Sequence, residues 1–222
     1  MFPLYDTVRS RRVPLVNLTL IAANILAFFY ESGLDFSALR EFVFEWGLIP
    51  NSLIIEPYIV WPTIFTSMFL HGGWFHILSN MWVLFIFGDN VEARMGGGRY
   101  LLFYLLSGIA AALLQSYILP TSAMPIIGAS GAVAGVLGAY LILFPRARVA
   151  SLVPILFLFT LVEIPAIIYL GFWFFSQLFS GWLSLRGTDS SEIAWWAHVG
   201  GFVFGLLAAN LLVRRRGGYR IG

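Results

Sequence analysis

Six long stretches of this 222-residue chain are almost entirely apolar, and the charged residues fall mainly between them. Only 11% of the residues are charged and 59% are hydrophobic, whereas a soluble globular domain carries about 25% charged residues. In lipid, a backbone must satisfy its own polar groups, and about 20 consecutive apolar residues in a helix span the hydrocarbon core. The sequence therefore predicts an all-α, polytopic membrane protein.

We predict six transmembrane helices in one membrane domain that covers residues 1–222. Their approximate bounds are 14–30, 74–91, 100–118, 130–144, 165–180 and 194–213. A large first loop, 31–70, carries apolar residues at helical spacing, which predicts amphipathic helices lying in the membrane interface. One stripe consists of Phe36, Leu39, Val43 and Trp46, and another of Trp61, Ile64, Phe65, Met68 and Phe69.

The fourth stretch is too short for an ordinary span. Pro145 and Arg146 end it, and its length from Ser130 to Phe144 is about 22 Å as a helix. The preceding loop, 120–128, contains no charged residue. We therefore expect this helix to begin inside the membrane, at the bottom of a cavity where non-helical backbone is tolerated.

The fifth stretch is instead too long, because 150–180 is predominantly apolar and its only charged residue is Glu163. Proline suits the first turn of a helix, and a carboxylate is favourable near a helix N-terminus. We therefore predict a helix start near Glu163, with Pro165 in the first turn and Glu163 as a structural cap. Ser151–Thr160 then becomes an interfacial or re-entrant segment.

Arginine is the only basic residue type besides histidine, and its distribution predicts the orientation. With both termini in the cytoplasm, only Arg40 and Arg186 lie outside, in agreement with the positive-inside rule. The cytoplasmic set is then Arg9, Arg11, Arg12, Arg94, Arg99, Arg146, Arg148, Arg214, Arg215, Arg216 and Arg220. The N-terminal segment is expected to be a retained anchor, and the scattered basic residues indicate no nucleic-acid partner.

Polar residues inside apolar sequence are the candidates for function. Ser130 begins the short fourth helix, where free backbone N–H groups surround a hydroxyl, although serine is also a common N-cap. Gly128 and Gly131 leave room for close backbone approach. His198 opens the sixth span, and Gly201 and Gly205 form a face that admits another helix. If this face packs against the glycines of the fourth helix, His198 reaches Ser130 and can act as its general base. The glycines of the fourth helix are Gly131, Gly135 and Gly138.

His76 and Asn80 are four residues apart on the second span, so they share a helix face and can donate to an oxyanion. His71 lies before that helix, where we expect it to brace the loop by hydrogen bonds. A zinc site is the competing interpretation. His71 and His76 have poor spacing for two ligands, and the chain has no cysteine. We therefore predict neither a metal nor a cofactor.

With these residues in place, the chain resembles a rhomboid intramembrane serine protease of the bacterial six-span type. The resemblance rests on HGGWFHILSN at 71–80, GASGAVAG at 128–135 and AHVGGFVFG at 197–205, in family order. It implies that Ser130 is the nucleophile and His198 the general base of a dyad. It also implies that His76 and Asn80, with the Ser130 N–H, stabilise the oxyanion, and that His71 is structural.

The chain departs from the family pattern at two places. Many members have Trp-Arg in the first loop, whereas this chain reads Trp61-Pro62. Some members carry a tyrosine one turn after the serine, stacked on the histidine, and here that residue is Ala134. What orients His198 is therefore open. By family analogy, substrate enters past Trp173, Phe174 and Phe175 of the fifth helix, and the loop from Gly181 to Glu192 is a cap.

The resemblance implies cleavage of transmembrane protein substrates within the lipid bilayer, at a site open to the outer face of a bacterial inner membrane. Two other classes remain. A non-catalytic relative that binds membrane clients typically lacks the serine or the histidine, and both are present here. A small transporter predicts acidic positions in several spans and internal repeats, which we do not find. Oligomeric state, substrate identity and cleavage motif are not determined by the sequence.

Overall fold

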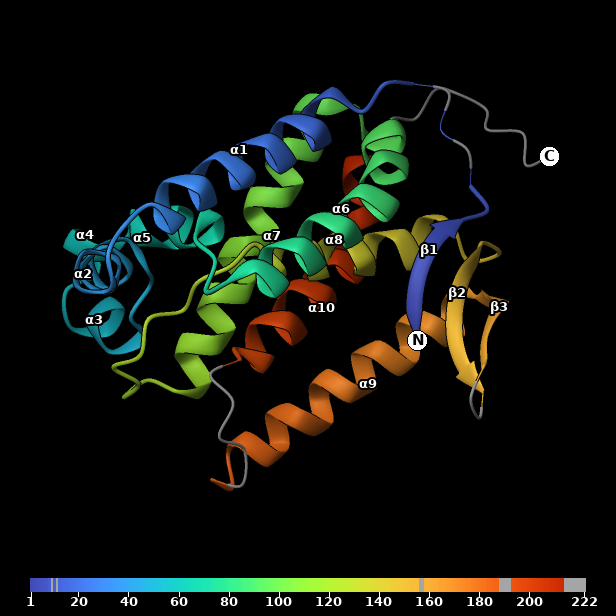
Figure 1. Ribbon diagram of the computed structural model, residues 1–222. Coiled ribbons are helices and arrows are strands. Elements are labelled where there is room, and N and C mark those ends of the chain that lie inside the picture. The colour runs from blue at the N-terminus through green and yellow to red at the C-terminus, as the bar shows by residue number, and fades with distance from the viewer. Residues whose placement is uncertain (9, 11, 156–157, 188–192, 214–222) are drawn as a thin grey trace.

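The computed structural model describes residues 1–8, 10, 12–155, 158–187 and 193–213, and most of them lie in helices packed into a bundle (Figure 1). The long apolar helices are α1 (Leu15–Ser32), α6 (Trp74–Met95), α7 (Gly97–Ile118), α8 (Ser130–Leu143), α9 (Ala166–Ser184) and α10 (Trp195–Leu212). They correspond in order to the six predicted spans. The predicted helical, polytopic membrane fold is confirmed.

Among the described residues, α1, α7, α9 and α10 are each long and apolar enough to cross a membrane. The helix α6 meets the same test together with the short helices before it, from which it is bent by 95°. The helix α8 has only 14 residues, fewer than the ~20 that a full span needs. A six-span arrangement therefore remains a proposal, in which α6 crosses by itself and α8 begins inside the membrane.

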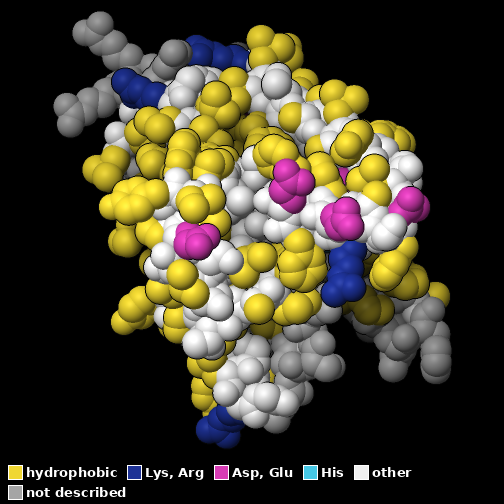
Figure 2. Space-filling view, turned by 90° about the vertical axis from the view of Figure 1, so that its left-hand side faces the viewer, with side chains coloured by type: hydrophobic (Ala, Val, Ile, Leu, Met, Phe, Trp, Pro, Cys, Tyr) yellow, Lys and Arg dark blue, Asp and Glu magenta, His cyan; other side chains and the backbone are white. Residues whose placement is uncertain are grey.

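The first loop is largely helical, as its two apolar stripes predict. It contains α2 (Phe36–Trp46), α3 (Pro50–Ile55), α4 (Pro57–Val60), α5 (Thr63–Thr66) and the 3-10 helix η1 (Ser67–Phe69). The first stripe forms α2, whose N-terminus is capped by Asp35 through the N–H groups of Ser37 and Ala38. In the second stripe, Trp61 follows α4, Ile64 and Phe65 lie in α5, and Met68 and Phe69 lie in η1. Figure 2 views the molecule from this end, where acidic side chains lie among apolar ones.

Arginines are concentrated away from the first loop. Arg94 and Arg99 flank the junction of α6 and α7, and Arg146 and Arg148 follow α8. In Figure 1 these junctions lie at the end of the bundle opposite α2–α5. Six of the predicted cytoplasmic arginines lie outside the described residues, namely Arg9, Arg11, Arg214, Arg215, Arg216 and Arg220. The cytoplasmic orientation of both termini stays a prediction.

A three-stranded antiparallel sheet was not predicted. It consists of β1 (Phe2–Asp6), β2 (Arg148–Ile155) and β3 (Leu158–Pro165), in the order β1-β2-β3. Within the predicted interfacial or re-entrant segment Ser151–Thr160, the described residues are strands of this sheet, and their position relative to the membrane stays a prediction. The other partner of β2 is the N-terminal strand, more than 140 residues away in sequence, so no local pattern reveals the pairing.

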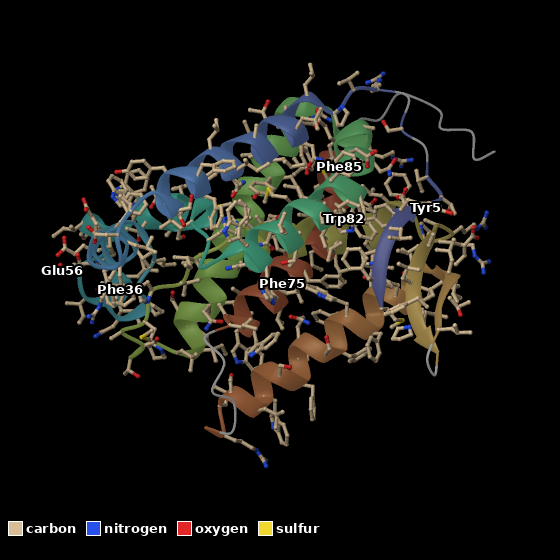
Figure 3. All side chains as sticks on the ribbon, in the orientation of Figure 1. Tyr5, Phe36, Glu56, Phe75, Trp82 and Phe85 are labelled. Atoms are coloured by element: carbon tan, nitrogen blue, oxygen red, sulfur yellow. The ribbon has the colours of Figure 1, made fainter. Side chains whose placement is uncertain are left out.

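The strand β1 is also held against α6. The Trp82 indole N–H donates to the Pro3 carbonyl at 2.7 Å, and the Phe2 ring stacks on Trp82 at a centroid distance of 5.7 Å. Figure 3 shows Tyr5 on β1 beside Trp82 and Phe85 of α6. The sheet therefore lies along the side of α6 rather than forming a separate domain.

The predicted role of Glu163 is also wrong. Glu163 lies in β3, where its Oε2 atom is 3.5 Å from Arg148 Nε, and both side chains are about half exposed. The helix α9 begins after Pro165 and has no acidic residue in its first turn. Its first N–H, that of Ala166, donates to the Ala147 carbonyl at 2.9 Å. Strand pairing holds Glu163 outside the helix.

The centre of the bundle is α8, which packs against α6, α7, α9 and α10. All residues from Gly131 to Tyr140 are buried. A Cβ atom at Gly201 or Gly205 of α10 would overlap the carbonyl oxygen of Gly131 or Gly135, so the two backbones are in direct contact. The predicted packing of these glycine faces is thus observed, and it sets the separation of the residues at the helix ends.

Candidate active site

The N-terminal ends of α8 and α10 bring a serine and a histidine together. Ser130 is the first residue of α8, and its Oγ atom lies 2.8 Å from Nε2 of His198. The N-cap of α8 is Ala129, and no side chain caps this helix end. The alternative reading of Ser130 as an ordinary N-cap is therefore wrong, because its hydroxyl is directed to the imidazole.

The position of His198 depends on how α10 begins. Gln115 of α7 accepts a hydrogen bond from the Ala197 backbone N–H through its Oε1 atom, at 3.0 Å. The first N–H groups of a helix have no acceptor one turn earlier in the same helix, and Gln115 supplies an acceptor for one of them. Together with the contact between Gly201 and Gly131, it places His198 above the start of α8.

The far side of the His198 ring faces α9. Its Nδ1 atom lies 2.7 Å from Oε1 of Gln177, which is buried. The Trp173 ring lies 6.0 Å from the imidazole centroid with an interplanar angle of 33°, and Trp195 approaches edge-on at 6.0 Å. These residues surround the imidazole, while Ala134 carries no aromatic ring. Sequence reasoning did not single out Gln177, although an amide within an apolar helix was a usable indication.

His76 lies beside the Ser130 hydroxyl. A Cβ atom at Gly128 would be 2.6 Å from His76 Nε2 and 3.6 Å from Ser130 Oγ, so Gly128 separates the two by the smallest possible residue. Gly128 also has a φ of 119°, which other residues rarely adopt. The Gly72 N–H donates to His76 Nδ1 at 3.4 Å. An accepting Nδ1 puts the ring proton on Nε2, which faces the serine.

Asn80 is one turn further along α6 and shares a face with His76. Its side chain is 7% exposed, and its Nδ2 atom has no hydrogen-bond partner among the described residues. A buried unpaired donor typically costs about 1–3 kcal/mol. An unpaired donor of this kind is expected at a site where an oxygen atom that becomes negatively charged during a reaction can accept its hydrogen bond.

His71 braces the loop before α6. Its backbone N–H donates to Glu31 Oε2 at 3.0 Å, and its Nδ1 lies 3.3 Å from the Phe69 carbonyl oxygen. Burial lowers the pKa of His71 to about 4, with a smaller effect from His76, so its ring is neutral at pH 7. The His71 and His76 rings meet edge to face at 5.0 Å. Among the described residues, no three His, Asp or Glu side chains form a possible metal site.

The expected entry surface on α9 is only partly observed. The Trp173 and Phe174 rings pack inward on Phe202 of α10, at 5.8 and 4.6 Å. Only Phe175 of the three points outward, with 69% of its surface exposed. The expected cap is also shorter, because Gly181–Ser184 belongs to α9. The part of that loop at 188–192 lies outside the described residues.

The site thus combines a hydroxyl, an imidazole within hydrogen-bond distance and several N–H donors near one helix N-terminus. This is the set of groups that acyl transfer by a serine nucleophile requires. Within the part of the chain that the structure describes, the helices around His198 supply no carboxylate, since α7, α8, α9 and α10 have neither aspartate nor glutamate.

Comparison with known proteins gives consistent matches. The family model for the Rhomboid domain matches residues 59–215. Rhomboid protease GluP of Bacillus subtilis is 33% identical over 199 residues, which is 90% of this chain and 35% of that protein. RHOMBOID-like protein 1 of Arabidopsis thaliana is 40% identical over 43% of this chain and 24% of its own length. Rhomboid protease AarA of Providencia stuartii is 32% identical over 46% of this chain and 36% of its own. The chain spans about a third or less of these relatives.

Proposed function

This chain belongs to the rhomboid family, and we propose that it is an intramembrane serine protease with Ser130 as nucleophile and His198 as general base. The relatives named as rhomboid proteases support a protease function. The single observation that carries the residue assignment is the 2.8 Å contact between Ser130 Oγ and His198 Nε2.

The first chemical step follows from this contact. As Ser130 Oγ attacks the carbonyl carbon of a peptide bond, its proton passes to His198 Nε2. The bond between carbon and nitrogen then breaks, and the imidazolium donates its proton to the leaving amine. Water then attacks the ester carbonyl carbon as His198 Nε2 takes its proton. The bond from the carbon to Ser130 Oγ breaks, the imidazolium returns the proton to Oγ, and the carboxylic acid product leaves.

Negative charge forms on the carbonyl oxygen during each attack. The backbone N–H of Ser130 at the start of α8, the His76 Nε2–H and the Asn80 amide are the donors that we assign to it. Their origin on two different helices makes the donor positions rigid, because both helices are packed into the bundle. A pre-positioned donor costs no reorganisation when charge develops.

The substrates that we propose are transmembrane segments of other membrane proteins. A peptide carbonyl in an intact helix is hydrogen-bonded within that helix, so the segment must partly unwind before attack. Glycine, proline and other residues that disfavour a helix are therefore expected near the cleaved bond. We further propose that the protein resides in a bacterial inner membrane, with both termini cytoplasmic and the site open to the outer face.

Labelling with a fluorophosphonate tests the proposal without knowledge of the substrate. Wild-type protein in detergent should be labelled, whereas Ser130→Ala and His198→Ala should not be. Ser32→Ala, at the exposed end of α1, is the matched control and should label normally. Equal labelling of all four proteins, or equal cleavage of a reconstituted single-span substrate, would refute the protease proposal and favour a client-binding role.

A further inference from the structure

The His198 ring has a side-chain hydrogen-bond partner at each of its two nitrogen atoms. Ser130 lies at Nε2, and among the described residues Gln177 is the partner at Nδ1. We propose that Gln177 is a positioning residue, which holds the neutral His198 ring with its proton on Nδ1 and its lone pair on Nε2. The inference rests on the proposed function, because only a general base requires that lone pair to face Ser130.

The orientation of the Gln177 amide follows from its own partners. Its Nε2 atom lies 3.2 Å from the Trp173 carbonyl oxygen and 2.8 Å from Ser176 Oγ. A carbonyl oxygen can only accept, so the atom facing it must be the NH₂ group. The Ser176 hydroxyl donates to the same carbonyl, which leaves the serine oxygen free to accept from Gln177. The other amide atom, Oε1, is therefore the one that faces His198.

This orientation determines the tautomer. An amide oxygen accepts a hydrogen bond and cannot donate one, so the Nδ1 atom 2.7 Å away must carry the proton. A neutral imidazole has only one N–H, and Nε2 consequently keeps its lone pair. That lone pair lies 2.8 Å from the hydroxyl of Ser130. Gln177 thus takes the place that an aspartate occupies in a Ser-His-Asp triad, but without charge.

The arrangement also connects two helices. Gln177 and Trp173, one turn apart on α9, contact the edge and the face of the same ring on α10. Among the residues that the structure describes, His76 is the titratable side chain that acts electrostatically on His198, and α7, α8, α9 and α10 contain no carboxylate. The base is therefore oriented by a neutral amide, and a displacement of α9 from α10 would remove its acceptor.

The tautomer can be measured directly, because the chain has only three histidines. Protein labelled with ¹⁵N-histidine should show, for His198, a protonated Nδ1 and an unprotonated Nε2, with His198→Ala providing the assignment. Gln177→Met keeps the side-chain length and removes the acceptor, so both tautomers should be populated. A wild-type spectrum with the proton on Nε2, or no change in Gln177→Met, would overturn the proposal.

The rate of fluorophosphonate labelling as a function of pH gives a second readout. Gln177→Met should lower the maximal rate by about 10- to 100-fold, by analogy with the loss of the hydrogen-bonded partner that orients a metal-bound histidine. Gln177→Glu should retain more activity and shift the acid limb of the profile to higher pH, since a carboxylate stabilises the protonated ring. Phe172→Leu, exposed on the same helix, is the control and should behave as wild type.

The two experiments separate this inference from the protease proposal. If wild-type Ser130 is not labelled at all, the protease proposal fails. If Ser130 is labelled and both Gln177 variants match the wild type in rate and pH profile, only the role of Gln177 fails. If Gln177→Met unfolds, the wild-type spectrum and the Gln177→Glu profile still decide the question.

Discussion

The Nε2 atom of His198 lies 2.8 Å from the Oγ atom of Ser130, although 68 positions separate the two residues in the sequence. Both stand at helix N-terminal ends, and the contact depends on how closely α8 and α10 approach. Glycines at 131, 135, 201 and 205 bring the two backbones into contact. The geometry of the proposed dyad is thus set by residues that carry no side chain.

Replacing Gly201 by alanine tests this dependence. The added Cβ would overlap the Gly131 carbonyl, which cannot move without shifting α8, so we expect destabilisation of about 1–3 kcal/mol or more and loss of labelling at Ser130. Gly171→Ala on α9 is the matched control, because its Cβ meets nothing within 4 Å. That variant should be neutral or more stable by up to about 1 kcal/mol. Thermal unfolding in detergent measures both, and equal stability of the two variants would contradict the argument.

Asn80→Ala tests the oxyanion assignment. It should lower kcat by about 100- to 1000-fold, the typical effect of removing one oxyanion donor. The unfolding temperature should change little, because the Asn80 Nδ2 atom has no hydrogen-bond partner to lose within the described part of the chain. Leu78→Ala, on the exposed face of α6, controls for helix truncation. An unchanged kcat in Asn80→Ala would exclude Asn80 from the site.

Glu92 should be important for stability rather than for activity. Its carboxylate accepts from the N–H groups of Val16 and Asn17 at 3.2 and 2.7 Å, and so caps α1 from a neighbouring helix. Glu92→Ala leaves both donors unpaired and should cost about 1–3 kcal/mol of unfolding free energy. Glu41→Ala, exposed on α2, should have no comparable effect. Denaturant titration of the two variants in parallel gives the comparison, and equal midpoints would count against the capping role.

Docking of the N-terminal strand should depend on pH through Asp6. Burial raises the pKa of Asp6 from 3.8 to about 7, and the nearby Asp89 contributes to the increase. Hydrogen bonds from Tyr140, Asn90 and the Val8 backbone act in the opposite direction and lower the pKa, but by less. The docked strand then binds a proton that the free strand does not, between about pH 4 and pH 7. Its docking should weaken as the pH rises through that window.

Hydrogen exchange of residues 2–6 measures the effect. Protection, corrected for the intrinsic exchange rate, should be higher at pH 5 than at pH 8. Asp6→Asn keeps the acceptor for Tyr140 and removes the titration, so its protection should be the same at both values. If the wild type and this variant respond equally to pH, another group controls the strand.

Much of this molecule follows from local sequence. The apolar stretches located all six long helices, because a helix satisfies its own backbone and needs only a continuous run of suitable residues. The start of α8 at Ser130 was predictable from the short run before Pro145. Polar residues isolated in apolar sequence marked Ser130, His198, His76 and Asn80, since such residues are costly in lipid.

The remaining features depend on contacts between distant parts of the chain. Strand β2 pairs with the distant N-terminal strand on one side and with β3 on the other. The pairing with β3 holds Glu163 in the sheet, outside the helix where its position near Pro165 had suggested a cap. Gln177 is one amide in an apolar helix, and only the packing of α9 on α10 directs it to His198. The amino-acid sequence by itself determined which segments form the long helices and which residues are candidates for chemistry, because both are local properties of residue type and spacing. The tertiary structure alone decided their partners, because a side-chain hydrogen bond across 21 positions and strand pairing across more than 140 positions depend on how whole elements pack.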